Sequence, residues 1–176
     1  MANADKSLTG AAGEHLVLSR LLARGLLAAQ APRGVRKVDI LVNFLDGGEP
    51  SLIQVKTSST GSGWAMNEKH ESIDDPDLFY CFVDIKPMHP TVHVVPAVEV
   101  AAIVRESHAA WLATPGRNGR EHRDNPMRRI HPVIPVRPTG WMDPYLENWD
   151  QIARPSHLLP SPAFSHAPLK RQGRLG

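Results

Sequence analysis

Four polar residues in the first third of the chain are of types that bind divalent cations and handle phosphate oxygens. Asp39 lies in one apolar run, and Gln54 and Lys56 lie two positions apart in the next. Glu14 precedes both runs. Carboxylate and amide oxygens are hard ligands, which suit Mg²⁺ or Mn²⁺ rather than zinc. A lysine beside them can orient water or stabilise negative charge, so these residue types predict metal-assisted hydrolysis of a phosphodiester if the fold brings them together.

The elements predicted around these residues bring three of them to one patch. Alternating apolar and polar positions predict strands over 35–44 and 52–57, joined by a turn signal at 46–48. With the turn centred on its middle residue, positions whose numbers sum to about 94 face each other, so Asp39 lies opposite residues 54–56. The amide and the ammonium are two positions apart and therefore project to the same face. The hairpin thus predicts a carboxylate, an amide and an ammonium in one small area.

A helix predicted over 7–24, ending before Gly25, carries the fourth residue. Its apolar residues recur at spacings of three and four: Leu8, Ala11, Val17, Leu18, Leu21 and Leu22. At about 100° per residue, Glu14 falls near the middle of this apolar stripe. A carboxylate on a buried face costs several kcal/mol unless a partner or a cation offsets its desolvation. We therefore expect Glu14 to meet the patch that contains Asp39.

The residue types alone leave a second interpretation open, because a buried ion-pair network holding the helix to the hairpin would use the same Glu, Asp and Lys. Other sites are less well supported. Five histidines show no mutual metal-ligand spacing and are interpreted as surface or hydrogen-bonded residues: His70, His93, His108, His122 and His131. The sequence contains no Gly-rich phosphate loop, nucleophile elbow or zinc-protease pattern. Cys81 is the one cysteine and lies in an apolar run, which indicates a small buried side chain.

The rest of the chain predicts a single mixed domain followed by a tail. The further elements are a short helix or turn with Trp64 in the core, two strands, a helix, and a final short helix with Trp149 packed inward, at 64–70, 78–85, 91–95, 97–112 and 141–152. This order is typical of an α/β or α+β domain with a central mixed sheet flanked by helices. We assign residues 1–153 to this domain. Prolines and basic residues in 154–176 predict an extended or disordered tail.

The composition is that of an ordinary soluble protein, with 41% apolar and 22% charged residues among 176. No run approaches the roughly 18 apolar residues of a membrane span, and the first residues lack a signal peptide's apolar stretch, so we expect a cytoplasmic protein. The net charge of +2 and the pI near 8.9 permit nucleic acid as a partner. An arginine cluster is equally compatible with a solvated loop and with a phosphate-contacting surface: Arg117, Arg120, Arg123, Arg128 and Arg129.

The polar residues and the runs that carry them resemble the motifs of the PD-(D/E)XK, or restriction-endonuclease-like, superfamily. The matching pieces are Gly13-Glu14, Val38-Asp39-Ile40-Leu41-Val42 and Ile53-Gln54-Val55-Lys56-Thr57. The resemblance covers roughly residues 7–95. Within the superfamily, the chain is similar to the Holliday-junction-resolvase-like and type IV restriction branches, in which a glutamine can replace the acidic residue of the third motif. The resemblance implies a restriction-endonuclease-like core: a helix, a three-stranded antiparallel unit, a helix and one further strand.

The resemblance further implies a nuclease that hydrolyses DNA with Mg²⁺ or Mn²⁺. Asp39 would be the central metal ligand, with the Gln54 amide oxygen and the Val55 carbonyl as further ligands. Lys56 would be the catalytic lysine, and Glu14 would support the metal. Gln54 departs from the acidic residue usual at its position and removes one negative charge. The alternative is therefore a non-catalytic nucleic-acid-binding or interaction module on a nuclease-like scaffold.

Basic and polar residues beside the motifs are candidates for nucleic-acid contacts: Arg33, Arg36, Lys37, Asn67 and Lys69. The first three lead into the strand that carries Asp39, and the other two follow the strand that carries Lys56. The family's habit of pairing also suggests a homodimer.

Overall fold

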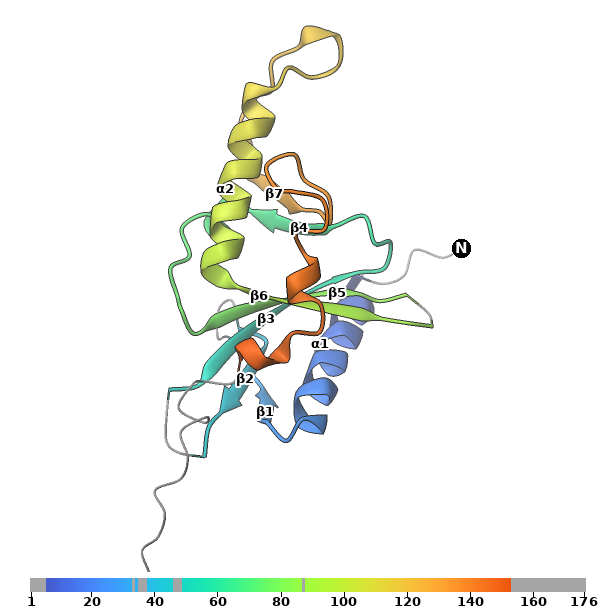
Figure 1. Cartoon of the computed structure of the whole chain (residues 1–176), viewed down its shortest axis with the longest axis vertical. Coiled ribbons are helices and arrows are strands. Elements are labelled where there is room, and N and C mark those ends of the chain that lie inside the picture. Colours follow the sequence, from blue (N-terminus) through green and yellow to red (C-terminus); the bar gives the residue numbers. More distant parts are fainter. Residues whose placement is uncertain (1–5, 33, 35–37, 46–48, 87, 153–176) are drawn as a thin grey trace, which may run out of the picture.

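The computed structural model describes residues 6–32, 34, 38–45, 49–86 and 88–152. Within these ranges the chain forms a five-stranded sheet in the order β1-β2-β3-β5-β6 and a two-stranded sheet of β4 and β7 (Figure 1). The strands are β1 Leu27–Gln30, β2 Ile40–Asn43, β3 Ser51–Ser58, β4 Trp64–Asn67, β5 Leu78–Asp84, β6 Thr91–Pro96 and β7 Met127–Ile130. The helices are α1 Lys6–Ala23 and α2 Ala97–Ala113, with 3₁₀ turns η1 Glu68–His70, η2 Arg117–Gly119, η3 Asp143–Tyr145 and η4 Trp149–Gln151.

The main sheet is mixed, which confirms the predicted fold class. β1, β2 and β3 form an antiparallel unit, β5 runs parallel to β3, and β6 returns antiparallel to β5. The helix that the superfamily's core has between the antiparallel unit and the parallel strand is not present here. The segment 64–70, predicted as a short helix or turn, instead forms β4 and the single turn η1. β4 pairs with β7, a partner 60 or so residues away that local sequence does not reveal.

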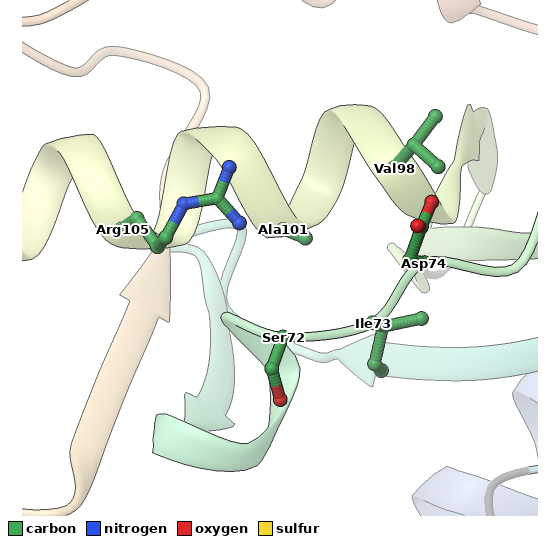
Figure 2. A pocket seen from close by; sticks show the side chains of 6 residues that line it. All are labelled: Ser72, Ile73, Asp74, Val98, Ala101 and Arg105. Atoms are coloured by element: carbon green, nitrogen blue, oxygen red, sulfur yellow. The ribbon is translucent and has the colours of Figure 1, made fainter.

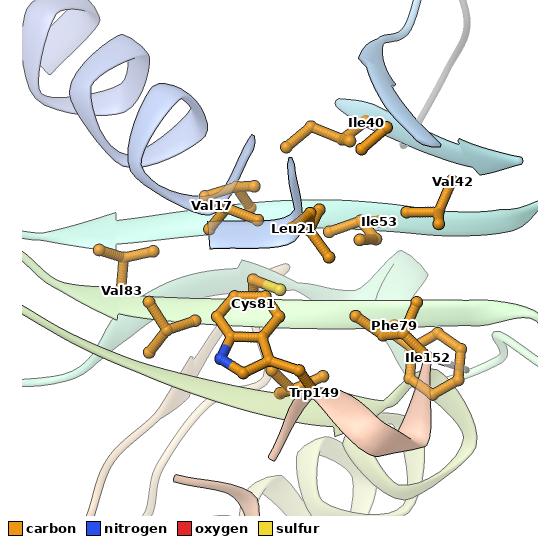
Figure 3. Packing of buried hydrophobic residues seen from close by; sticks show 14 of the residues in the cluster. Val17, Leu21, Ile40, Val42, Ile53, Phe79, Cys81, Val83, Trp149 and Ile152 are labelled. Carbon is orange, nitrogen blue, oxygen red and sulfur yellow. The ribbon is translucent and has the colours of Figure 1, made fainter. Parts of the chain in front are cut away.

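The two faces of the sheet bury two separate apolar clusters. On one face, Val17 and Leu21 of α1 pack on Ile53 and Val55 of β3, and Trp149 joins the same cluster (Figure 3). On the other face, α2 and the β4–β7 pair cover side chains of β5 and β6. Trp64 belongs to this second cluster and is 3% exposed, which confirms the prediction that it packs in the core. Because strand side chains alternate, odd and even positions of β3 face different layers.

Several predicted boundaries need correction. The strand predicted from residue 35 begins at Ile40, and the short strands β1 and β7 were not predicted. β1 has the sequence LAAQ and β7 the sequence MRRI, neither of which shows a strand's apolar pattern, so pairing partners rather than local preference define them. The final helix predicted over 141–152 is replaced by η3 and η4, although Trp149 is buried as expected. The predicted tail, 154–176, lies outside the described residues.

Candidate active site

Asp39 lies where β2 stops pairing regularly with β3. Ile40, the first residue of β2, pairs with Ile53, and Asp39 lies one position before this register. Asp39 meets β3 at Ile53 and at Val55, and Val55 is within the span 54–56 predicted from the turn. The backbone N–H of Asp39 donates to the carbonyl of Ile53 at 2.8 Å. Its carboxylate Oδ2 accepts a hydrogen bond from the Val55 N–H at 2.7 Å. In a regular β2–β3 ladder a backbone carbonyl of β2 would accept this bond, so here the side chain replaces it. The carboxylate is thereby fixed against the backbone of β3.

Gln54 and Lys56 point to the face of β3 that α2 covers. Ile53 and Val55 belong to the cluster under α1, so the alternating positions lie on the opposite side. In the parallel register Gln54 is beside Tyr80, and Lys56 is beside Phe82. The two polar side chains therefore lie next to the apolar layer of the second cluster, half-buried rather than on an open surface.

Six buried polar atoms of the described residues have no hydrogen-bond partner, and two of them, Gln54 Oε1 and Tyr80 Oη, belong to residues paired in the β3–β5 register. A buried polar atom without a partner costs about 1–3 kcal/mol, and a water molecule, an ion or a ligand can satisfy it. Tyr80 was not among the predicted site residues. Its polar hydroxyl inside an otherwise apolar run was the available signal, but the register that places it beside Gln54 cannot be read from local sequence.

Lys56 and Asp39 influence each other through the low-dielectric interior. Burial lowers the pKa of Lys56, and the attraction of the Asp39 carboxylate acts in the opposite direction. Burial also raises the pKa of the Tyr80 phenol, and Asp39 adds to this effect. Asp39 is thus close enough to act on groups of both β3 and β5.

Glu14 lies on α1, which packs on the other face of the sheet. Among the described residues of α1, the buried ones are Gly13, Val17 and Leu21, so Glu14 stands beside this stripe rather than near its middle as predicted. Burial raises the pKa of Glu14, and the Asp39 carboxylate raises it further. The Asp39 carboxylate therefore acts on both Glu14 and Lys56.

The close approach of α1 to β3 explains the glycine that precedes Glu14. A Cβ at Gly13 would lie 1.9 Å from Thr57 Oγ1 and 3.0 Å from Thr57 Cβ. Non-bonded heavy atoms make favourable contact at about 3.5–4.0 Å, so a side chain at this position would push the helix away. Glycine allows the helix backbone to lie directly on the strand that carries Gln54 and Lys56.

The arrangement offers oxygen donors for a hard cation but not a complete carboxylate cluster. No three His, Cys, Asp or Glu side chains of the described residues come together as a metal site. A cation would therefore depend on the unpartnered Gln54 Oε1 and on a backbone carbonyl besides Asp39. In a β-strand, the N–H and the C=O of one residue point toward the same neighbouring strand. Because the Val55 N–H points toward Asp39, the Val55 carbonyl does as well. The donor set fits Mg²⁺ or Mn²⁺.

The residues predicted to contact nucleic acid are only partly described. Arg33, Arg36 and Lys37 lie outside the described residues. Asn67 and Lys69 are exposed, and the Asn67 side chain accepts the backbone N–H of Lys69 at 3.1 Å, which caps η1.

The turn η1 also connects these exposed residues to the candidate site. The ring of His70, the last residue of η1, packs edge-on against Tyr80 with 5.9 Å between ring centroids. Asn67 and Lys69 are therefore near the strand neighbour of Gln54, with their side chains exposed.

A shallow groove lies elsewhere, between α2 and the segment that enters β5 (Figure 2). Its lining is Ser72, Ile73, Asp74, Val98, Ala101 and Arg105. None of the candidate site residues contributes to it, and Asp74 is its one carboxylate. The groove is not part of the candidate active site.

Neither a protein-family model nor a curated protein sequence matches this chain. Among solved structures, the chain is similar to a bacterial homing endonuclease, I-Ssp6803I, with 16% identity and a TM-score of 0.49 over 84% of this chain and 91% of that one. A likeness of this size does not by itself indicate what this chain binds or cleaves. None of the described helices is both long and apolar enough to cross a membrane.

Proposed function

We propose that this chain is a metal-dependent nuclease that hydrolyses DNA phosphodiester bonds at a site made by Asp39, Gln54, Lys56 and Glu14. The observation that carries the proposal is the position of Asp39. Its carboxylate is anchored on the backbone of β3 and acts on both Glu14 and Lys56. An unpartnered amide oxygen lies on Gln54, the residue before the Val55 whose N–H binds the Asp39 carboxylate.

The chain's own groups divide the chemistry between them. Asp39, Gln54 Oε1 and the Val55 carbonyl would hold Mg²⁺ or Mn²⁺, with Glu14 as support from α1. When bound, such an ion supplies Lewis-acid stabilisation of charge on phosphate oxygens and lowers the pKa of water. The N–H of Val55 fixes one carboxylate oxygen of Asp39, which leaves the other free.

Lys56 is suited to moving a proton beside a phosphate. Because burial lowers its pKa, its ammonium gives up a proton more readily than that of an exposed lysine. The Asp39 carboxylate opposes this effect and favours the charged form of Lys56. A charged ammonium stabilises the negative charge that develops on the phosphate.

The test is cleavage of plasmid, linear, single-stranded and branched DNA with Mg²⁺ or Mn²⁺, beside a chelator control. Asp39→Asn keeps an oxygen that can accept the Val55 N–H but removes the charge, so we expect a folded protein that does not cut. The matched control is Asp74→Asn, an exposed aspartate of the groove, which should cut like the parent.

A second readout does not depend on turnover. Binding of Mn²⁺ to the folded state should stabilise the protein and so raise its Tm. At a Mn²⁺ concentration one hundred times the Kd, the gain in the free energy of unfolding is about 2.7 kcal/mol. Asp39→Asn should lose this increase, and Asp74→Asn should keep it. Cleavage that persists in Asp39→Asn would reject the proposed site. Asp39-dependent metal binding without cleavage of any substrate would favour the non-catalytic module instead.

A further inference from the structure

The last two turns of α2 project from the folded body, beyond the bonds that Arg105 and Glu106 make to Glu71 and Arg137. The buried residues of α2 end at Val104, and none of residues 105–113 is buried. At about 1.5 Å per residue, this stretch is about 13 Å long. Residues 114–126 then return to β7, and Figure 1 shows this extension (yellow) at one end of the molecule's long axis. We call residues 105–126 the arm.

The arm is held together by contacts of its own. Trp111 stacks on His122 with 4.0 Å between ring centroids and on His108 with 5.4 Å, so the returning chain is fastened to the helix. His108 Nε2 also lies 2.8 Å from Asp124 Oδ1. Near its base, Asp124 lies 3.6 Å from a guanidinium nitrogen of Arg128, a residue of β7. These contacts give the arm a defined shape before any ligand arrives.

Three guanidinium groups on the arm are not used by the fold. Arg117, Arg120 and Arg123 are exposed and form no ion pair with any residue that the structure describes. The buried Arg128 differs, because it pairs with Glu71 and with Asp124. An arginine cluster without internal partners on a preformed projection has the properties of a polyanion-binding surface.

The aromatic groups of the arm favour duplex over single-stranded nucleic acid. Proteins that bind single strands stack bases on free aromatic faces. Trp111 is the large aromatic side chain of the arm; it is 38% exposed, and its ring stacks on His122 and on His108. The arm therefore offers three exposed guanidinium groups for phosphates, and its large aromatic ring is already partly covered by these two contacts.

We propose that the arm is a docking element for the phosphate backbone of duplex DNA, with Arg117, Arg120 and Arg123 as the contacting residues. The choice of DNA as the polyanion rests on the proposed function. The contact itself needs neither a metal ion nor Asp39, and it assigns a surface well apart in sequence from the motifs of the candidate active site. For Arg117, Arg120 and Arg123 it chooses phosphate contact over the solvated loop that the sequence left equally open, whereas Arg128 of the same cluster is paired within the fold.

The experiment measures binding of the full chain to a fluorescein-labelled duplex of about 30 base pairs, roughly three helical turns, by anisotropy in the presence of EDTA. The variant carries Arg117→Ala, Arg120→Ala and Arg123→Ala. The control removes three exposed positive charges elsewhere, by Lys6→Ala, Arg24→Ala and Lys86→Ala. Because Arg24 lies over the Trp149 ring and Lys86 pairs with Asp84, binding is compared at a temperature at which circular dichroism shows the parent and both variants to be folded.

Each phosphate contact contributes about 0.9 to the slope of log K against log salt on duplex DNA. We therefore expect the arm variant to lose up to about 2.7 of slope and to bind at least about tenfold more weakly at 50 mM salt, while the control keeps the parent's slope. An arm variant that matches the parent, or a control that loses as much, would overturn the inference. An equal loss on the corresponding single strand would also overturn it.

The two proposals fail separately in these measurements. The nuclease proposal is read from cleavage and Mn²⁺ binding by Asp39→Asn, and the arm is read from duplex binding by the arginine variant in EDTA. If the parent cuts no DNA but the arm variant alone loses duplex binding, the arm stands and the nuclease proposal falls. If cleavage depends on Asp39 but duplex binding does not change when the three arginines are replaced, the nuclease proposal stands and the arm proposal falls.

Discussion

Replacing Gly13 with alanine tests the close approach of α1 to β3, on which the position of Glu14 depends. In an isolated helix interior, Gly→Ala raises helix stability by about 1 kcal/mol. Here the added Cβ would lie 1.9 Å from Thr57 Oγ1, and 3.0 Å from both Thr57 Cβ and Thr57 Cγ2. Turning the threonine side chain relieves the first contact but not the contact with its Cβ, so the helix backbone has to move.

The expected magnitude follows from these two opposing effects. Overpacking of this kind costs about 1–3 kcal/mol, and the very short contact argues for the upper end. Subtracting the gain of about 1 kcal/mol in helix propensity leaves a net loss of about 2 kcal/mol in the free energy of unfolding for Gly13→Ala. Gly10, on the same helix, has nothing within 4 Å of a built Cβ, so Gly10→Ala should gain about 1 kcal/mol.

The assay is thermal and urea unfolding of both variants, followed by circular dichroism. The two should differ by about 3 kcal/mol, which corresponds to roughly 6–12 °C in Tm for a chain of this size. Shortening the opposing side chain, in the double variant Gly13→Ala with Thr57→Ala, should recover part of the loss, because Oγ1 and Cγ2 are then gone. A Gly13→Ala protein as stable as Gly10→Ala would refute the reasoning that the helix backbone rests on β3.

Two further predictions concern the polar groups around Asp39. The raised pKa of Glu14 means that its ionised form is disfavoured in the folded state, so the stability it contributes is present below its ordinary pKa of 4.5 and is lost as pH rises through the folded pKa. In metal-free buffer Glu14→Gln should therefore raise Tm, with an advantage that appears above pH 4.5 and then levels off; a Tm lowered equally at every pH would contradict this. Tyr80→Phe removes a buried hydroxyl that lacks a partner among the described residues, so urea unfolding should show a change of less than about 1 kcal/mol in stability. If Tyr80 serves the reaction, cleavage should fall while stability does not, and a stability loss well above 1 kcal/mol would show that the hydroxyl is satisfied.

Those elements whose pattern is set by burial on a face were predicted well from sequence. α1, β3, β5, β6 and α2 lie within one or two residues of their expected ranges, because their apolar periodicity reflects the two clusters that they cover. β1, β4 and β7 were missed since their stability comes from partners distant in sequence. The apolar periodicity also predicted the wrong position for Glu14 on α1. Exposed apolar residues such as Leu8 and Leu22 made the predicted apolar face wider than the face that is buried.

The arrangement of the candidate site could not be predicted because it depends on both faces of one sheet. A hairpin fixes which residues of two strands oppose each other, but the pairing of β2 with β3 begins at Ile40 and Ile53, so Asp39 lies one position outside the register that the turn predicts. A hairpin does not say which face a helix will cover, and α1 covers the face opposite Gln54 and Lys56. Asp39 can still act on groups from both sides because it precedes the first paired residue of β2, where its side chain binds the Val55 N–H instead of lying in a regular ladder. Had β2 continued through residue 39 as predicted, the backbone would have supplied that bond, and the carboxylate would have faced only one layer. Because β2 begins only at Ile40, the Asp39 side chain binds the backbone of β3, and the proposed site depends on this feature.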